Sequence, residues 1–315
     1  MGNLTILNEF LLLGFGSLHG LQFFLLGIFL GIYVVTLLGN ILILTVISLD
    51  CSIQTPMYFF LSNFSFFEIW YTTSIAPKML QTHLSGPQVI SFVGCVVQFY
   101  FFGSMAVVEC FLLAAMSYDR YFAICSPPQY PSLMNVYTCI PLAGGSWLGE
   151  FLTPVVTVTM TFQLQPIRFC PTYKFDHFFC DLAPVLELVC SDTETVEETT
   201  FLLASFVTMA PFLLTVASYS HNVAAVLRIP SAAGKQWAFS TCSSHLIVVT
   251  LYYRTLGTVY TIPTATQAVA LNKIFSLFYT VVTPMVNPIV YSLRNKDVKK
   301  AVRRLMSQWV YAKRT

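Results

Sequence analysis

The sequence has few charged residues. Asp, Glu, Lys and Arg together make up 10% of the 315 residues, whereas 56% are hydrophobic and 15% are aromatic. A soluble domain usually carries about 25% charged residues, so this composition excludes a soluble globular protein. The chain is expected to lie in a membrane.

Three further features are missing. There is no nucleophile–base pair and no metal triad, since His221 and His245 stand alone on apolar segments, so we do not expect an enzyme. There is no internal repeat and no pair of broken helices, which argues against a secondary transporter. Residues 1–21 lack the basic start and apolar core of a cleaved signal peptide, so the first span is expected to act as the insertion signal.

What the sequence does contain is a series of long apolar stretches, such as Gly20–Leu49, which has no charged residue. About 20 apolar residues suffice to cross a bilayer as a helix. We therefore predict an all-α membrane protein, with a seven-transmembrane helix bundle in residues 1–293 and a cytoplasmic tail with a short amphipathic helix in residues 294–315. The spans are expected at about 22–48, 56–80, 89–122, 138–160, 199–227, 236–262 and 270–293.

The basic residues indicate the orientation. Lysines and arginines cluster after Leu293, whereas residues 161–198 carry seven acidic residues and only Arg168 and Lys174. Cytoplasmic segments carry the excess of Lys and Arg, so we predict a cytoplasmic C-terminus and an extracellular N-terminus in the plasma membrane. The sequon at Asn3 is then placed where it can be glycosylated. In the tail, apolar and basic residues alternate, which predicts a helix lying on anionic lipids.

Ionisable residues inside the spans are few and are expected to be functional. At 1.5 Å per residue, Glu68 and Glu109 both lie roughly 16–18 Å from the cytoplasmic end, and Asn40 and Asn287 fall at similar depth. We predict that these residues form a polar core. Two carboxyl groups this close would share a proton or a cation. The alternative is that Glu68 is protonated and only donates a hydrogen bond.

The nine cysteines fall into two groups. Five lie in or under the spans and are expected to be reduced: Cys51, Cys110, Cys125, Cys139 and Cys242. The other four, Cys95, Cys170, Cys180 and Cys190, are expected outside and allow three pairings. His177 beside Cys180 also suggests a metal site, but disulfides are favoured in an oxidising compartment.

Several strings of residues are typical of one receptor family. They are Met116-Ser-Tyr-Asp-Arg-Tyr-Phe-Ala-Ile-Cys125, Pro56-Met-Tyr-Phe-Phe-Leu61, Ala238-Phe-Ser-Thr-Cys-Ser-Ser-His-Leu246 and Pro284-Met-Val-Asn-Pro288-Ile-Val-Tyr291-Ser-Leu-Arg-Asn295. On these strings the chain resembles the odorant receptors of the tetrapod-type class II group, a branch of the rhodopsin-like G-protein-coupled receptors.

The resemblance implies disulfides Cys95–Cys180 and Cys170–Cys190, and an olfactory stimulatory G protein that raises cyclic AMP. It implies that Arg120 pairs with Asp119 at rest and faces the G protein once the sixth helix moves outward. Elsewhere in the superfamily the polar core holds sodium; no other cofactor is expected. The implied coupling residues are Asp119, Arg120, Tyr121, Pro128, Tyr219, Asn287, Pro288 and Tyr291.

The ligand is expected in the upper part of the bundle. On the third helix, the stripe that joins Arg120 to Glu109 continues to Ala106, Phe102 and Cys95. Stripes of this kind predict an apolar cavity with a few hydroxyls, which suits a small hydrophobic odorant. Ordinary helix packing is the alternative for each position. The expected lining residues are Phe102, Gly103, Ala106, Val107, Leu203, Val207, Tyr253, Leu256, Tyr260, Ser276, Tyr279 and Thr280.

Some residues depart from the family's pattern. Pro128 stands where the family usually has Leu, and Glu150 and Arg254 place charges inside the fourth and sixth spans. Arg254 has three possible roles: snorkelling to lipid headgroups, binding an acidic odorant, or pinning the outer loop through an ion pair. The candidate partners for that pair are Asp176, Asp181 and Glu187.

Taken together, these patterns predict an odorant receptor that binds small volatile organic ligands and activates the stimulatory olfactory G protein. Membrane lipids are expected partners and nucleic acids are not. A seven-helix transporter and a non-olfactory chemosensory receptor are the alternatives.

Overall fold

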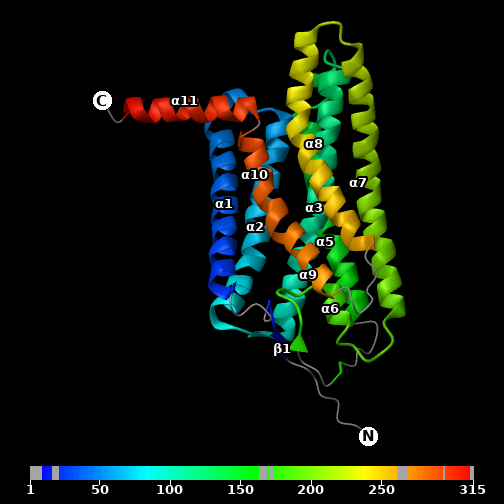
Figure 1. Ribbon diagram of the computed structural model, residues 1–315. Coiled ribbons are helices and arrows are strands. Elements are labelled where there is room, and N and C mark those ends of the chain that lie inside the picture. Colours follow the sequence, from blue (N-terminus) through cyan, green and yellow to red (C-terminus); the bar gives the residue numbers. More distant parts are fainter. Residues whose placement is uncertain are drawn as a thin grey trace.

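Long helices dominate the computed structural model, which describes residues 9–15, 21–162, 169–170, 174–261, 269–293 and 295–312 (Figure 1). Each expected span corresponds to one long helix or, for the last span, to three consecutive segments. These are α1 (Gln22–Leu49), α2 (Pro56–Ser85), α3 (Phe92–Cys125), α5 (Val136–Phe162), α7 (Glu194–Arg228), α8 (Ala232–Thr261), and then α9 (Val269–Leu277), the π-helix η3 (Phe278–Val282) and α10 (Thr283–Leu293).

Several helix ends differ from the ends of the expected spans; α2, for example, continues to Ser85 and does not end at about 80. The fifth helix begins at Glu194 and not at 199, because acidic residues in a first helical turn, here Glu194 and Glu197, interact favourably with the helix dipole. The third helix begins at Phe92 and not at 89, because residues 88–91 form a strand. The charge-free stretch marks the apolar part of each helix and not the whole helix.

A three-stranded sheet covers one end of the bundle. It consists of β1 (Glu9–Leu12), β2 (Gln88–Ser91) and β3 (Lys174–Phe175) in the order β2-β1-β3, with β1 antiparallel to β2 and parallel to β3. Phe10 and Leu12 alternate with exposed Glu9 and half-buried Leu11, and pack on a small core that includes Cys180. We call this sheet together with residues 176–181 the lid, and this end of the bundle the lid end.

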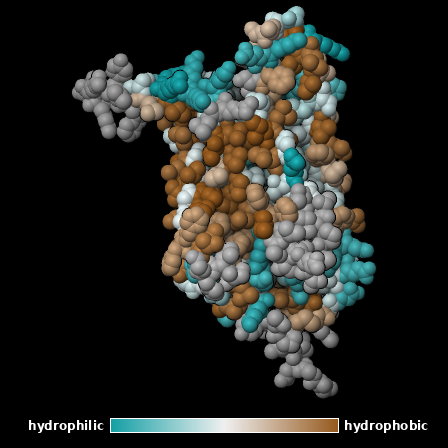
Figure 2. Space-filling view, in the orientation of Figure 1, coloured by the Kyte–Doolittle hydropathy of each residue, from teal (hydrophilic) through white to brown (hydrophobic). Residues whose placement is uncertain are grey.

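The sides of the bundle are apolar. Four helical stretches among the described residues are long and apolar enough to cross a membrane: Gln22–Leu49, Phe92–Cys125, Glu194–Arg228 and Lys273–Ser292. The other three expected spans, α2, α5 and α8, are helices of 30, 27 and 30 residues. In Figure 2, hydrophobic side chains gather over the middle of the bundle and polar ones near its two ends. A belt of this kind is typical of a surface that contacts lipid.

The tail forms the expected amphipathic helix, α11 (Lys296–Ala312), which runs across the end opposite the lid (Figure 1). Val298 and Ala301 are buried against the bundle. Arg304 forms an ion pair of 3.2 Å with Asp50, which lies just before the short helix η2 (Cys51–Ile53). The side chain of Trp309 lies outside the described residues.

Candidate functional site

At the end opposite the lid, Asp119 holds two partners. Its Oδ2 accepts from Arg120 Nη2 at 2.8 Å, which is the pair expected for the resting state, and its Oδ1 accepts from the Tyr130 hydroxyl at 2.7 Å. Asp119 is fully buried, so both contacts compensate its lost hydration. Tyr130 begins the short helix α4 (Tyr130–Leu133), and sequence reasoning missed it. Its position two residues after exposed Pro128, in the loop that follows α3, was the available signal.

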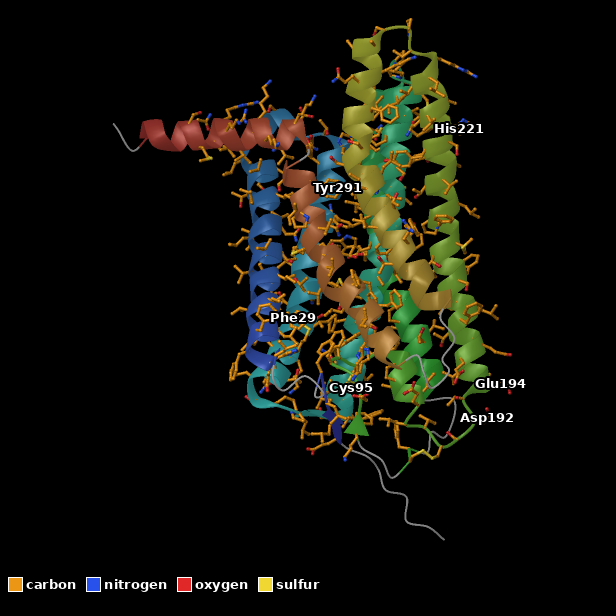
Figure 3. The ribbon with its side chains drawn as sticks, viewed as in Figure 1. Phe29, Cys95, Asp192, Glu194, His221 and Tyr291 are labelled. Atoms are coloured by element: carbon orange, nitrogen blue, oxygen red, sulfur yellow. A yellow bond between two sulfur atoms is a disulfide. The ribbon has the colours of Figure 1, made fainter. Side chains whose placement is uncertain are left out.

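Two residues taken to be isolated have aromatic partners. The Tyr219 hydroxyl on α7 and His245 Nδ1 on α8 share a hydrogen bond of 2.5 Å, and both side chains are buried. The ring of His221, labelled in Figure 3, lies 5.7 Å from that of Tyr121. The prediction that both histidines stand alone was therefore wrong. Helical spacing shows that a histidine lies on an apolar helix, but it does not show which neighbouring helix faces it.

The polar core is only partly assembled as expected. Asn287 Nδ2 donates to Glu68 Oε1, and Glu109 lies beside Glu68 on the facing helix α3. Asn40 differs: its Nδ2 donates to the carbonyl of Thr36 in its own helix at 3.0 Å. Counting residues along the helix predicts a level for Asn40 but not the hydrogen-bond partner of its side chain.

Around Glu68, four buried oxygens have no hydrogen-bond partner among the described residues. They are Glu68 Oε2, Ser65 Oγ, Asn287 Oδ1 and the Tyr291 hydroxyl. Oxygen atoms of this kind fit water, a shared proton or a hard cation such as sodium. No group of three or more His, Cys, Asp or Glu side chains that could hold a metal ion occurs in the described part of the chain.

Pro288 lies where α10 approaches α1 closely. The Cβ that Gly39 of α1 lacks would come within 2.8 Å of Pro288 Cβ on α10. The glycine therefore lets α10 pack directly against α1 and holds the segment that carries Asn287 and Tyr291. Figure 3 shows Tyr291 at the end far from Cys95.

At the lid end, three aromatic rings meet beneath the loop. Phe102 of α3 lies 4.9 Å from Phe179 of the lid and 5.5 Å from Tyr279, measured between ring centroids. Tyr71 of α2 adds a fourth ring at 5.9 Å from Phe102. Phe102 and Tyr279 were expected here. Phe179 and Tyr71 were missed, although the run His177-Phe-Phe-Cys180 was an available signal.

The other expected lining residues on α3 divide between two faces. Ala106 faces α8, since its carbonyl accepts from the Tyr252 hydroxyl at 2.7 Å. Gly103 faces α5: a Cβ there would first meet Pro154, at 3.8 Å. Val107 lies on the same side, close to Gly149.

The remaining helices place their expected residues as follows. On α8 the inward tyrosine is Tyr252, which sequence reasoning passed over, whereas Tyr253 packs against Phe212 of α7 at 4.9 Å. Ser276 and Thr280 are buried, and the Thr280 hydroxyl donates to the Ser276 carbonyl. Leu203, Val207 and Leu256 are half-buried, and the side chain of Tyr260 lies outside the described residues.

Both expected disulfides are present, Cys95–Cys180 and Cys170–Cys190. His177 Nδ1 donates to the carbonyl of Phe179 at 3.2 Å, so this histidine is part of the loop's own fold. The lid is also joined to α9: Lys273 forms an ion pair of 2.5 Å with Asp176 and donates to the carbonyl of Gly14. The Tyr279 hydroxyl donates to Asp181 at 3.2 Å.

Arg254 lies on an exposed stripe of α8, together with Leu251 and Gly257. Of the three acidic residues considered beside it, Asp176 pairs with Lys273 and Asp181 accepts from Tyr279. The side chain of Glu150 and the whole of Asn3 lie outside the described residues.

Comparison with known proteins supports one family. The family profile described as "Olfactory receptor" matches residues 29–309. The chain is 51% identical to human olfactory receptor 10A5 over 305 residues, which is 96% of this chain and 95% of that protein. It is 44% identical to mouse olfactory receptor 5AP2 over 308 residues, 98% of this chain and 96% of that one. Squid rhodopsin has the same fold, with a TM-score of 0.68, 16% identity, and coverage of 93% of this chain and 87% of its own.

Proposed function

The chain belongs to the olfactory receptor family, and from that premise we propose that it binds a small hydrophobic odorant beneath the lid and activates the stimulatory olfactory G protein at the Arg120 end. It is an odorant receptor of the G-protein-coupled class and a multi-pass membrane protein. The ligand site, the G protein and the orientation are the finer parts of the proposal.

One observation carries the proposal: α3 is a single helix of 34 residues that reaches both sites. Its first turns carry Cys95 and Phe102, which hold the lid and the aromatic rings. Its last turns carry Asp119 and Arg120. A ligand that moves the rings therefore acts on the same rigid element that holds the Asp119–Arg120 pair.

The proposed mechanism is a population shift. In the resting arrangement Arg120 is paired with Asp119, and Tyr219 is bonded to His245. An odorant that binds better to the active arrangement increases the population in which the sixth helix, α8, has moved outward and Arg120 faces the G protein. The ligand shifts this equilibrium only by its difference in affinity for the two states.

The proposed orientation places the lid outside the cell and Arg120 and α11 in the cytoplasm. The two disulfides at the lid end support this, since disulfides persist in oxidising compartments. The basic residues of α11 support it as well. We also propose that Glu68 and Glu109 hold one shared proton or a sodium ion, because the oxygens around them suit either occupant.

The test is a panel of volatile odorants applied to cells that express the receptor, with cyclic AMP as the readout. We expect at least one odorant to raise cyclic AMP, and the response to vanish in cells that lack the stimulatory G protein α-subunits. A response that persists in those cells would contradict the choice of G protein. Uptake of a labelled solute without any cyclic AMP response would favour a transporter.

A further inference from the structure

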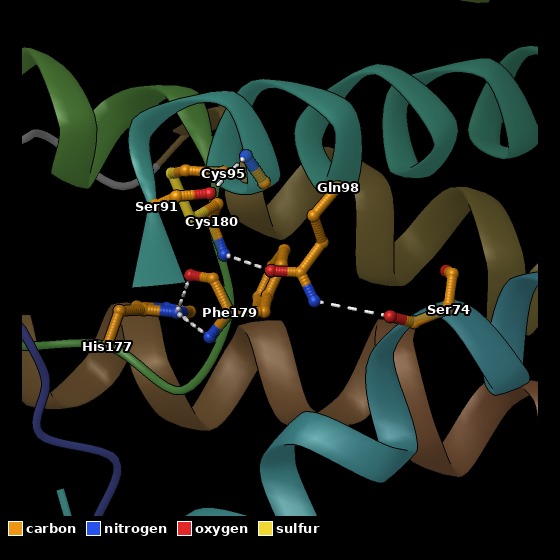
Figure 4. The surroundings of a disulfide bond; sticks show 8 residues. Ser74, Ser91, Cys95, Gln98, His177, Phe179 and Cys180 are labelled. Carbon is orange, nitrogen blue, oxygen red and sulfur yellow. Dashed lines mark hydrogen bonds between the residues drawn. A yellow bond between two sulfur atoms is a disulfide. The ribbon is translucent and has the colours of Figure 1, made fainter. Parts of the chain in front are cut away.

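Gln98 stands between the lid and the helices beneath it. Its side chain is 8% exposed, its Oε1 accepts from the backbone N–H of Cys180 at 3.0 Å, and its Nε2 donates to the carbonyl of Ser74 on α2 at 3.2 Å. Figure 4 shows this amide lying across the gap between the loop and α2. One buried side chain thus joins three segments of the chain.

The local sequence explains why both contacts form. Cys95 and Gln98 are three residues apart on α3 and so lie on the same face, with Gln98 one turn and Cys95 two turns from Phe102. On α2, Pro77 lacks the N–H that the Thr73 carbonyl would accept in a regular helix, so helical hydrogen bonding is disturbed in the turn that contains Ser74. A carbonyl in a distorted turn can accept from a side chain of another helix. The Cys180 N–H is buried in the loop and needs an acceptor.

The hydrogen bond between Gln98 and the Cys180 N–H constrains the loop in addition to the disulfide. The Cys95–Cys180 bond fixes where residue 180 lies, and the Lys273–Asp176 and Tyr279–Asp181 contacts also hold the loop. The hydrogen bond from the Cys180 N–H to Gln98 acts directly on the peptide group that joins Phe179 to Cys180. The neighbouring ring of Phe179 is thereby held over Phe102 and Tyr279, with ring centroids 4.9 and 6.4 Å away.

We propose that Gln98 is a positioning residue that sets the height of the Phe179 ring above Phe102 and Tyr279, and through it the length of odorant that fits beneath the lid. The length limit rests on the proposed function, since it takes the odorant to lie under this ring. The positioning of the loop does not, because it can be measured without any ligand.

The ligand-free test uses the disulfide itself. Cys95 and Cys180 are 2% and 0% exposed, so a reductant reaches them only when the lid opens. Gln98→Met removes both hydrogen bonds and keeps the side-chain length. Only the bond to the Cys180 N–H attaches the lid, because the bond to Ser74 joins α3 to α2. One such bond is worth roughly a factor of five in an equilibrium, so we expect a phosphine reductant to cleave Cys95–Cys180 ~5-fold faster in this variant.

The chain offers matched controls for this measurement. Cys190 is exposed, so the Cys170–Cys190 bond should be cleaved at the same rate with and without Gln98. Gln88→Met removes an amide at the same end whose bond is local, to the Gly86 carbonyl, and should leave both rates unchanged. If Gln98→Met does not fold, Gln98→Glu keeps the acceptor for Cys180 and should accelerate cleavage to a smaller extent. A wild-type rate for Cys95–Cys180 in the variant that folds would overturn the proposal.

The ligand-dependent test uses straight-chain alcohols from pentanol to dodecanol, with cyclic AMP as the readout. At matched surface expression, Gln98→Met should shift the longest activating alcohol to a greater chain length. A loss of expression lowers all responses together and does not move this limit. An unchanged limit in a variant with faster disulfide cleavage would overturn the link between Gln98 and ligand length. Failure of every odorant to activate the wild type would contradict the proposed function, and the cleavage result would stand apart from it.

Discussion

Substitution of Gly39 by alanine should destabilise the receptor, although alanine is the better helix former. The added Cβ would lie 2.8 Å from Pro288 Cβ and 3.1 Å from Pro288 Cγ, both in a rigid ring. Ordinary contacts begin near 3.4 Å, so α1 and α10 must separate by roughly half an ångström or more. Overpacking of this kind costs about 1–3 kcal/mol. Because Asn287 adjoins Pro288, the same displacement strains its bond to Glu68.

The assay is the melting temperature of the detergent-purified receptor, followed by agonist-dependent cyclic AMP. Gly27 and Gly31 lie on the same helix, and a Cβ added at either would have nothing within 4 Å, so Gly27→Ala and Gly31→Ala are matched controls. We expect these controls to be neutral or more stable by up to about 1 kcal/mol, whereas Gly39→Ala melts several degrees lower. Equal melting temperatures for all three variants would refute the close-approach reasoning.

Three further outcomes follow from named contacts. Tyr130→Phe removes one of the two partners of buried Asp119, a loss of about 1.5–3 kcal/mol for a charged acceptor, so basal cyclic AMP should rise. Tyr137→Phe, at an exposed tyrosine, is the control. Equal basal cyclic AMP in the two variants would contradict the role of Tyr130. Burial, aided by the charge of Lys273, lowers the pKa of His177 from the ordinary 6.5 to about 3. Because the folded lid resists protonation of this histidine, the stability of the lid falls as the pH drops from about 6.5 toward 3. At about pH 5 the loss is about 2 kcal/mol. Acid should therefore speed cleavage of Cys95–Cys180 relative to Cys170–Cys190, and a pH-independent ratio would count against this. Arg254→Gly should leave potency unchanged for acids and neutral odorants alike, because Arg254 faces outward; selective loss of acid responses would place it in the ligand site.

The seven long helices could be predicted because lipid imposes one strong rule on sequence: charges are excluded over a bilayer's thickness. The lid could not be predicted from pattern. Its strands have two to four residues and come from three distant parts of the chain, Glu9–Leu12, Gln88–Ser91 and Lys174–Phe175. Segments this short carry too little periodicity to stand out.

Depth within the membrane could be counted, but rotation about each helix axis could not. Counting placed Asn40 and Glu68 at one level, yet Asn40 bonds to its own helix. Among the expected lining residues on α3, Phe102 lies under the lid, whereas Gly103 faces Pro154 of α5. His245 is the same case, since its partner Tyr219 lies 26 residues away on another helix. Which helices lie next to one another depends on the packing of the whole bundle, so the pattern of a single helix does not predict it.

The central claim is that an odorant under the lid is read out at Asp119 and Arg120. The most direct measurement is agonist-dependent activation of the stimulatory G protein by wild type and Arg120→Ala at equal surface expression. The pair lies at the far end of α3 and its loss leaves the disulfides and the lid intact, so the variant should reach the surface and bind agonist. We predict that its G-protein activation is abolished. A response equal to that of the wild type would contradict the account.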